Sequence, residues 1–158
     1  MKICMITQDF PPKARGAGQY AYKLAKGLRD RGHEVVVLTR GSSNALYTLD
    51  NFDGINVYRV RFVKAYPFHL ELHRKFIEMV LREEIKDCDI LHLHTPSVPV
   101  VQIGDIPVVS TFHGTAYGGS KRRGHKDVYS IGIKLSLPLL INTEKRIITV
   151  SYTHLRAH

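Results

Sequence analysis

The sequence has 158 residues, of which 44% are hydrophobic and 23% charged, a composition typical of a globular domain with its own core. No apolar run approaches the length of a membrane span, and the N-terminus does not resemble a secretory signal, so we expect a cytoplasmic protein. The two cysteines, Cys4 and Cys88, fit neither a disulfide framework nor a zinc motif. The net charge of +9 favours anionic partners, but basic and aromatic residues are not interleaved, so nucleic acid is not expected.

Hydrophobic periodicity predicts strands that alternate with helices. The run Ile3–Ile6 is a buried strand, and a helix with one apolar face extends from about Gly18 to Asp30. The β-branched run Val35–Thr39 is typical of a strand in a parallel sheet. The later elements expected are a short edge strand at Leu46–Leu49, a strand at Asn56–Phe62, a helix at Leu70–Ile85, strands at Asp89–His94 and Pro107–Phe112, a loop at Thr115–Asp127, a kinked helix at Ser130–Ile141 and a strand at Arg146–Val150. This alternation predicts an α/β fold with a Rossmann-like, doubly wound parallel sheet.

The glycine-rich stretch Thr7–Tyr20 connects the first strand to the first helix. Gly16 and Gly18 allow the backbone to approach a ligand, because they carry no Cβ. The helix that follows directs its free N–H groups and the positive end of its dipole into the loop. This pattern is compatible with a phosphate site, and also with an ordinary strand-to-helix turn.

Several histidines lie at spacings that bring side chains together. His69 and His73 share a helix face, and His92 and His94 share a strand face, which raises the question of zinc. The order of residues in HLELH is not that of the H-E-x-x-H motif, so no metal site is expected. His113 follows a strand directly, a position where a histidine more often binds local backbone than a ligand.

Five segments in a fixed order resemble one family. They are the FPP and Gly-rich loop, RGHEVVVLT, DILHLH, PVVSTFHG and RIITVS. Together they resemble the N-terminal domain of a retaining glycosyltransferase of the GT-B fold, family 4, from Met1 to about Ser151. The resemblance implies that residues 1–151 form the acceptor-side domain and that a C-terminal domain, absent here, binds the nucleotide-sugar donor. Residues 152–158 are interpreted as a truncated or artefactual tail.

The resemblance also implies roles for particular residues. Gly16 and Gly18 correspond to the glycines that contact the donor diphosphate, although Arg15 stands where the family often has another glycine. His113 corresponds to the histidine of the family's T-x-H-G motif and is the predicted catalytic residue. It would hydrogen-bond a sugar hydroxyl or direct positive charge toward the leaving phosphate. No cofactor or metal is expected, because the nucleotide sugar is itself a substrate.

Contacts with the acceptor are expected at His94, Gly114 and Arg122. Arg122 belongs to a basic loop, which either contacts an anionic or lipid-linked acceptor at the inner membrane face or is plain surface charge. The predicted function is transfer of a sugar from a nucleotide-sugar donor to a sugar or lipid-linked acceptor, with the fragment alone inactive. The alternatives are a GT-B nucleotide-sugar epimerase and a non-catalytic module that binds a phosphorylated ligand.

Overall fold

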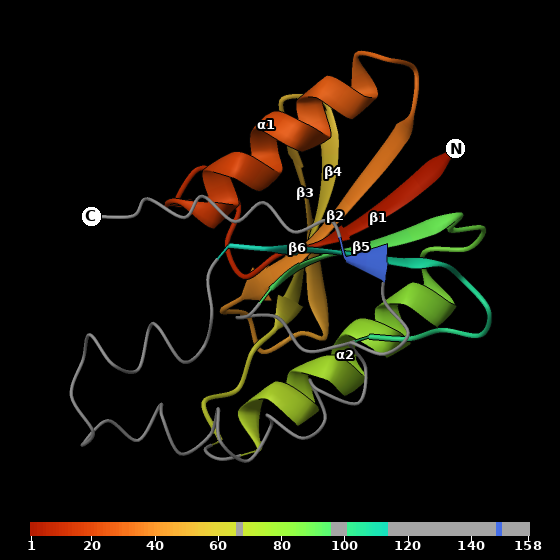
Figure 1. Ribbon diagram of the computed structural model, residues 1–158. Coiled ribbons are helices and arrows are strands. Elements are labelled where there is room, and N and C mark those ends of the chain that lie inside the picture. Colours follow the sequence, from red (N-terminus) through yellow and green to blue (C-terminus); the bar gives the residue numbers. More distant parts are fainter. Residues whose placement is uncertain (66–67, 96–100, 114–147, 150–158) are drawn as a thin grey trace, which may run out of the picture.

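The computed structural model describes residues 1–65, 68–95, 101–113 and 148–149, and these form one seven-stranded sheet with α1 and α2 on opposite faces (Figure 1). The elements in chain order are β1 (Lys2–Ile6), α1 (Ala17–Arg29), β2 (Glu34–Gly41), β3 (Tyr47–Phe52), β4 (Ile55–Arg61), α2 (His69–Glu83), β5 (Ile90–Thr95), β6 (Val108–Phe112) and β7 (Ile148–Thr149). Both helices lie close to their predicted ranges. The predicted loop at 115–127 and kinked helix at 130–141 lie outside the described residues.

The strand order is β3-β4-β2-β1-β5-β6-β7, with β1 at the centre of the sheet. Neighbouring strands are parallel except for β3 and β4, which form an antiparallel hairpin at one edge. Its turn is Asp53-Gly54, where both residues have positive φ angles of 51° and 75°, as a two-residue Asp-Gly turn requires. The α/β fold class with a doubly wound, mostly parallel sheet is therefore confirmed. The edge strand β3 is antiparallel, because the tight turn reverses the chain without a crossover helix.

Two apolar clusters fill the space between the sheet and its helices. Successive residues of β1 point to opposite faces, so Met5 packs on the α1 side while Cys4 and Ile6 pack on the α2 side. Helix α1 contributes the small residues Ala21 and Ala25 to its cluster. The sheet is thus covered on both faces, as a doubly wound fold requires. Neither described helix combines the length and the apolar character needed to cross a membrane.

Candidate functional site

The candidate site lies where the strand order changes direction. From β1 the chain proceeds to β2 on one side, and β5 later pairs with the other side of β1. In open α/β sheets the crevice for ligands forms at such a switch point, beyond the carboxyl ends of the strands. Thr7 follows β1, His94 lies near the end of β5, and His113 follows β6 directly.

The histidines of β5 and His113 form a connected row. Nδ1 of His94 lies 2.9 Å from Nε2 of His113, within hydrogen-bonding distance. On its other side, the ring of His94 stacks on His92 with ring centroids 4.6 Å apart. Nε2 of His92 lies 2.8 Å from Oγ1 of Thr111 on β6. The row therefore ties β5 to β6 and ends at His113, which is exposed.

Tyr20 connects the glycine-rich loop to this row. It lies in the first turns of α1 and its ring packs edge-on against His113, with centroids 5.1 Å apart, and against His94 at 6.0 Å. The side chain is 47% exposed, so the ring borders the site rather than the core. The sequence interpretation assigned Tyr20 no role. An aromatic residue in the first turns of a helix that follows a glycine-rich loop was the available signal.

Gly16 and Gly18 differ in what surrounds them. Gly16 caps α1 with a φ of 44°, and a Cβ built there would meet no atom within 4 Å. Gly18 is buried, and a Cβ there would lie 2.6 Å from both the backbone oxygen and Oδ1 of Asp9. Gly18 is therefore needed for the loop to fold on itself, whereas Gly16 leaves open space beside its backbone. Neither observation tests phosphate binding directly.

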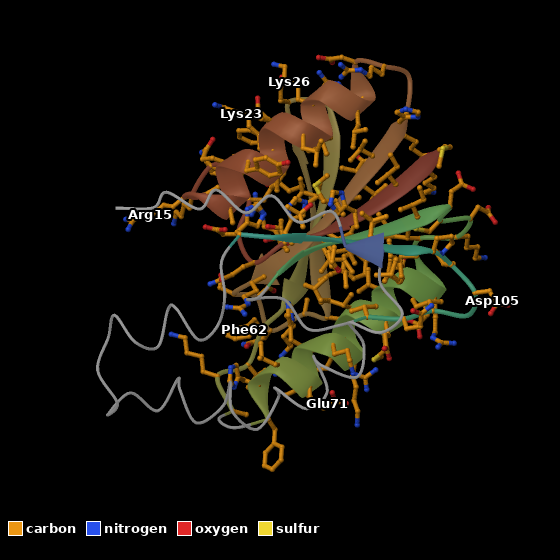
Figure 2. All side chains as sticks on the ribbon, viewed as in Figure 1. Arg15, Lys23, Lys26, Phe62, Glu71 and Asp105 are labelled. Atoms are coloured by element: carbon orange, nitrogen blue, oxygen red, sulfur yellow. The ribbon has the colours of Figure 1, made fainter. Side chains whose placement is uncertain are left out.

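Asp9 organises the loop from within. Its Oδ2 accepts a hydrogen bond from the backbone N–H of Arg15 at 3.1 Å, and its carbonyl accepts one from Oγ1 of Thr7 at 3.2 Å. The side chain of Arg15 is exposed and extends from the N-terminal end of α1 away from the sheet (Figure 2). Asp9 thus has the turn-capping role that Asp often takes.

Burial keeps the histidines of the row neutral. Desolvation lowers the pKa of His92 to about 4 and that of His94 to about 3, and neighbouring histidines add to both shifts. Desolvation also lowers the pKa of His113. Near neutral pH these rings are uncharged, so each has one N–H donor and one bare nitrogen. This favours a hydrogen bond from His113 over the alternative in which it carries positive charge.

The other predicted histidine pair lies on the opposite face of the sheet. Nδ1 of His73 donates to the carbonyl of Arg61 at 2.9 Å, and its ring packs edge-on against Phe62. His69 also packs against Phe62. The two histidine pairs therefore do not converge. Within residues 1–65, 68–95, 101–113 and 148–149, no group of three or more His, Cys, Asp or Glu is arranged to hold a metal ion.

The structure thus brings together two of the predicted site residues, His94 and His113. Tyr20 connects them to the start of α1, where Gly16 and Gly18 lie. His94 is 2% exposed and contacts the exposed His113 through its Nδ1, so it lies deeper in the protein than His113. Gly114 and Arg122, the other predicted acceptor contacts, lie outside the described residues.

Comparisons with known proteins point to one family. The model of Glycosyltransferase Family 4 matches residues 14–157. An uncharacterized glycosyltransferase of Methanocaldococcus jannaschii is 33% identical over 75% of this chain and 32% of its own length. A phosphatidyl-myo-inositol mannosyltransferase of Mycolicibacterium smegmatis is 29% identical over 70% of this chain and 29% of its own. The chain therefore spans about a third of these curated relatives.

A solved structure shares the fold. The catalytic domain of starch synthase IV from Arabidopsis thaliana, bound to ADP and acarbose, superposes on 94% of this chain and 51% of its own with a TM-score of 0.55. The sequence identity is 12%, so the similarity concerns the fold alone. It agrees with the α/β architecture predicted from the sequence.

Proposed function

This chain belongs to glycosyltransferase family 4, and from that premise we propose that it forms the acceptor-side domain, residues 1–151, of an enzyme that transfers a sugar from a nucleotide-sugar donor. Because the chain spans about a third of its curated relatives, the activity is proposed for the complete enzyme, in which a second domain supplies the donor site. Residues 1–151 alone are expected to be inactive, since they hold one wall of the cleft.

The observation that supports this proposal most is the meeting of the glycine-rich loop with His113 at the switch point of the sheet. Tyr20 packs against His113, so the start of α1 and the end of β6 border the same space. Free N–H groups at the start of a helix favour an anion, and Gly16 leaves room for one to approach. A donor diphosphate at this helix start would place its sugar next to His113.

In this arrangement the chain's groups would act by hydrogen bonding and by the helix dipole. As the bond to the sugar breaks, negative charge develops on the leaving diphosphate, and the N-terminus of α1 stabilises it. His113 is neutral and would hold a sugar hydroxyl in place. Retention of configuration stays a prediction from the family resemblance.

The acceptor is proposed to be a sugar or a lipid-linked molecule. The relative from Mycolicibacterium smegmatis is named for phosphatidyl-myo-inositol, which supports the lipid-linked option. Lys23 and Lys26 lie on the outer side of α1 (Figure 2), where Lys26 is paired with Asp53 and Lys23 is exposed. An exposed basic side chain on this surface favours contact with anionic lipid headgroups. We propose that the enzyme works in the cytoplasm, with peripheral contact at the inner membrane face.

The test is a transfer assay on the complete enzyme with a panel of nucleotide sugars, each offered with free sugars or with phosphatidylinositol vesicles. Formation of a glycosylated acceptor supports the proposal, and the product identifies the acceptor class. Epimerisation of the donor in the absence of acceptor would instead favour the epimerase. Binding of nucleotide sugars without turnover of any would favour the non-catalytic module.

A further inference from the structure

We propose that His94 is a positioning residue that donates its Nδ1–H to Nε2 of His113 and so leaves Nδ1–H of His113 as the donor available to a ligand. The assignment of protons concerns this chain alone. It deepens the proposed function, on which it rests only where the ligand is taken to be a sugar substrate.

The two rings are arranged for a strong, in-plane hydrogen bond. Their planes are inclined by 11° and their centroids are 5.2 Å apart, although the bonded nitrogens of His94 and His113 are separated by 2.9 Å. Rings stacked face to face at that nitrogen distance would have much closer centres. The rings therefore lie edge to edge in nearly one plane, the geometry in which an N–H points at a bare ring nitrogen.

Packing prevents His94 from turning away. The side chain is 2% exposed and its ring stacks on His92, which is itself tied to Thr111. Because this contact joins two neighbouring strands, rotation of His94 would require the whole row to rearrange. A buried ring with fixed orientation can determine which nitrogen of an exposed partner remains free.

The direction of the hydrogen bond follows from the other nitrogen of His94. Nε2 of His94 is buried and has no hydrogen-bond partner among the residues that the structure describes. Buried N–H groups without partners are rarer than buried acceptors without partners. The proton of neutral His94 is therefore assigned to Nδ1, where it is used, and Nε2 is bare. His113 must then accept at Nε2, so its own proton is on Nδ1.

This assignment limits what His113 can do. A ring nitrogen that already carries its proton cannot remove one from a hydroxyl, so Nδ1 of the exposed His113 is not a general base. It can donate to an oxygen lone pair, which both a sugar hydroxyl and a phosphate oxygen provide. The role of His94 is to hold His113 in the donor form while remaining out of contact with the ligand.

Nitrogen-15 NMR of the histidine rings tests the assignment directly in the protein at neutral pH. The sequence contains nine histidines, so the His113 signals are identified by their loss in the His113→Gln variant. We expect the His113 spectrum of a protonated Nδ1 and a bare Nε2, coupled to a protonated Nδ1 of His94. The reverse pattern, with the proton of His113 on Nε2, would overturn the proposal.

Two substitutions at His94 separate positioning from packing. In His94→Asn the amide N–H takes the place of Nδ1–H, and the His113 signals should keep the wild-type pattern. In His94→Leu the donor is lost, so His113 should populate both tautomers and kcat should fall about tenfold, the value of one or two neutral hydrogen bonds. An unchanged His113 spectrum in His94→Leu would contradict the proposal, and circular dichroism checks that this variant is folded.

The NMR spectrum tests the proton assignment and the transfer assay tests the proposed function, so either can be contradicted without the other. If the NMR pattern is as expected but no sugar is transferred, the proposed function is wrong and the proton assignment stands. If sugar is transferred but His113 carries its proton on Nε2, the proposed function stands and the role assigned to His94 is wrong. If the ligand is a nucleoside diphosphate without a sugar, its addition alone should shift the Nδ1 signal of His113.

Discussion

Each face of the sheet carries a pair of histidines, His69 and His73 on one and His92 and His94 on the other, and all but the partly buried His92 are buried. Burial lowers the pKa of His73 on the α2 face to about 4, as it does for His92 on the α1 face. The pairs differ in where their hydrogen bonds lead. His73 on α2 donates to the backbone carbonyl of Arg61 on β4, whereas the row that begins at His92 ends at the exposed ring of His113.

This difference shows which property distinguishes histidines of a functional site from histidines that only pack in the core. A pKa lowered by burial is found on both faces, at His73 and at His92 and His94, so it does not identify function. A continuous path from buried groups to an exposed one, at the carboxyl ends of strands, is present on the α1 face. We therefore expect changes on the α2 face to affect stability and changes along the row to affect turnover.

The largest effect is expected for Ile77→Ala on the α2 face. Ile77 is fully buried, so removing its side chain leaves a cavity and should lower the free energy of unfolding by about 4 kcal/mol. Urea denaturation measures this change. The kcat per folded molecule should be unaffected. A fall in kcat with normal stability would show that the α2 face contributes to turnover, contrary to the distinction drawn between the two faces.

Acid should destabilise the fold through His73. Desolvation holds its folded pKa near 4, below the ordinary value of 6.5, so the unfolded state binds the proton more readily between these values. Stability from this group is fully present above pH 6.5 and falls as the pH drops, by about 3 kcal/mol at pH 4. The charge of Arg40 nearby acts in the same direction.

Urea denaturation between pH 4 and pH 7 checks this dependence. The His73→Gln variant, which cannot titrate, should lose less stability over the same range than the wild type. Equal slopes for the two proteins would show that His73 is not the group responsible. The histidines of the α1 face contribute a slope of the same sign in both proteins, because their pKa values are also lowered.

Substitution of His113 should act on turnover. In the complete enzyme His113→Ala should lower kcat about 100-fold, the effect of removing one donor from a transition state. Stability should fall by about 1 kcal/mol, because the buried Nδ1–H of His94 loses its acceptor. His33, which precedes β2 at the opposite end of the sheet, offers a matched histidine control, and His33→Ala should leave kcat unchanged.

An equal loss of turnover and nucleotide affinity in His113→Ala would indicate a structural role. Isothermal titration with the donor nucleotide gives the affinity and steady-state kinetics gives kcat, so the two effects are measured separately.

The smallest effect is expected for Tyr20. Its edge contacts with His113 and His94 support the orientation of the row from the loop side, and Tyr20→Ala should lower kcat/KM about fivefold. Tyr20→Phe keeps the ring and should remain within about twofold of the wild type. If the phenylalanine variant loses as much as the alanine variant, the hydroxyl and not the ring is the important group.

Much of the fold was predictable because its signals are local. Short runs rich in apolar residues predicted a strand at or near each strand that the structure describes. Gly32, the glycine after α1, marks the end of that helix with a φ of 84°. The antiparallel edge was missed even though Asp53-Gly54 is a hairpin signal, because the short strand before it has exposed and intermediate residues in no strict alternation.

The sequence by itself determined the elements, which follow from residue type and spacing along the chain. Its resemblance to the family, carried by five motifs in order, nominated Gly16, Gly18, His94 and His113. Only the tertiary structure decided how they act together: pairing of β5 with β6 joins His94 to His113 across 19 residues, and packing of α1 brings Tyr20 to both.

The same holds for the different surroundings of the two glycines. In sequence they are equivalent, but Asp9 occupies the space beside Gly18 and none of the described residues does so beside Gly16. The physical reason is that periodicity and turn chemistry depend on neighbours in the chain, whereas hydrogen-bond direction and free volume depend on groups that only folding brings together.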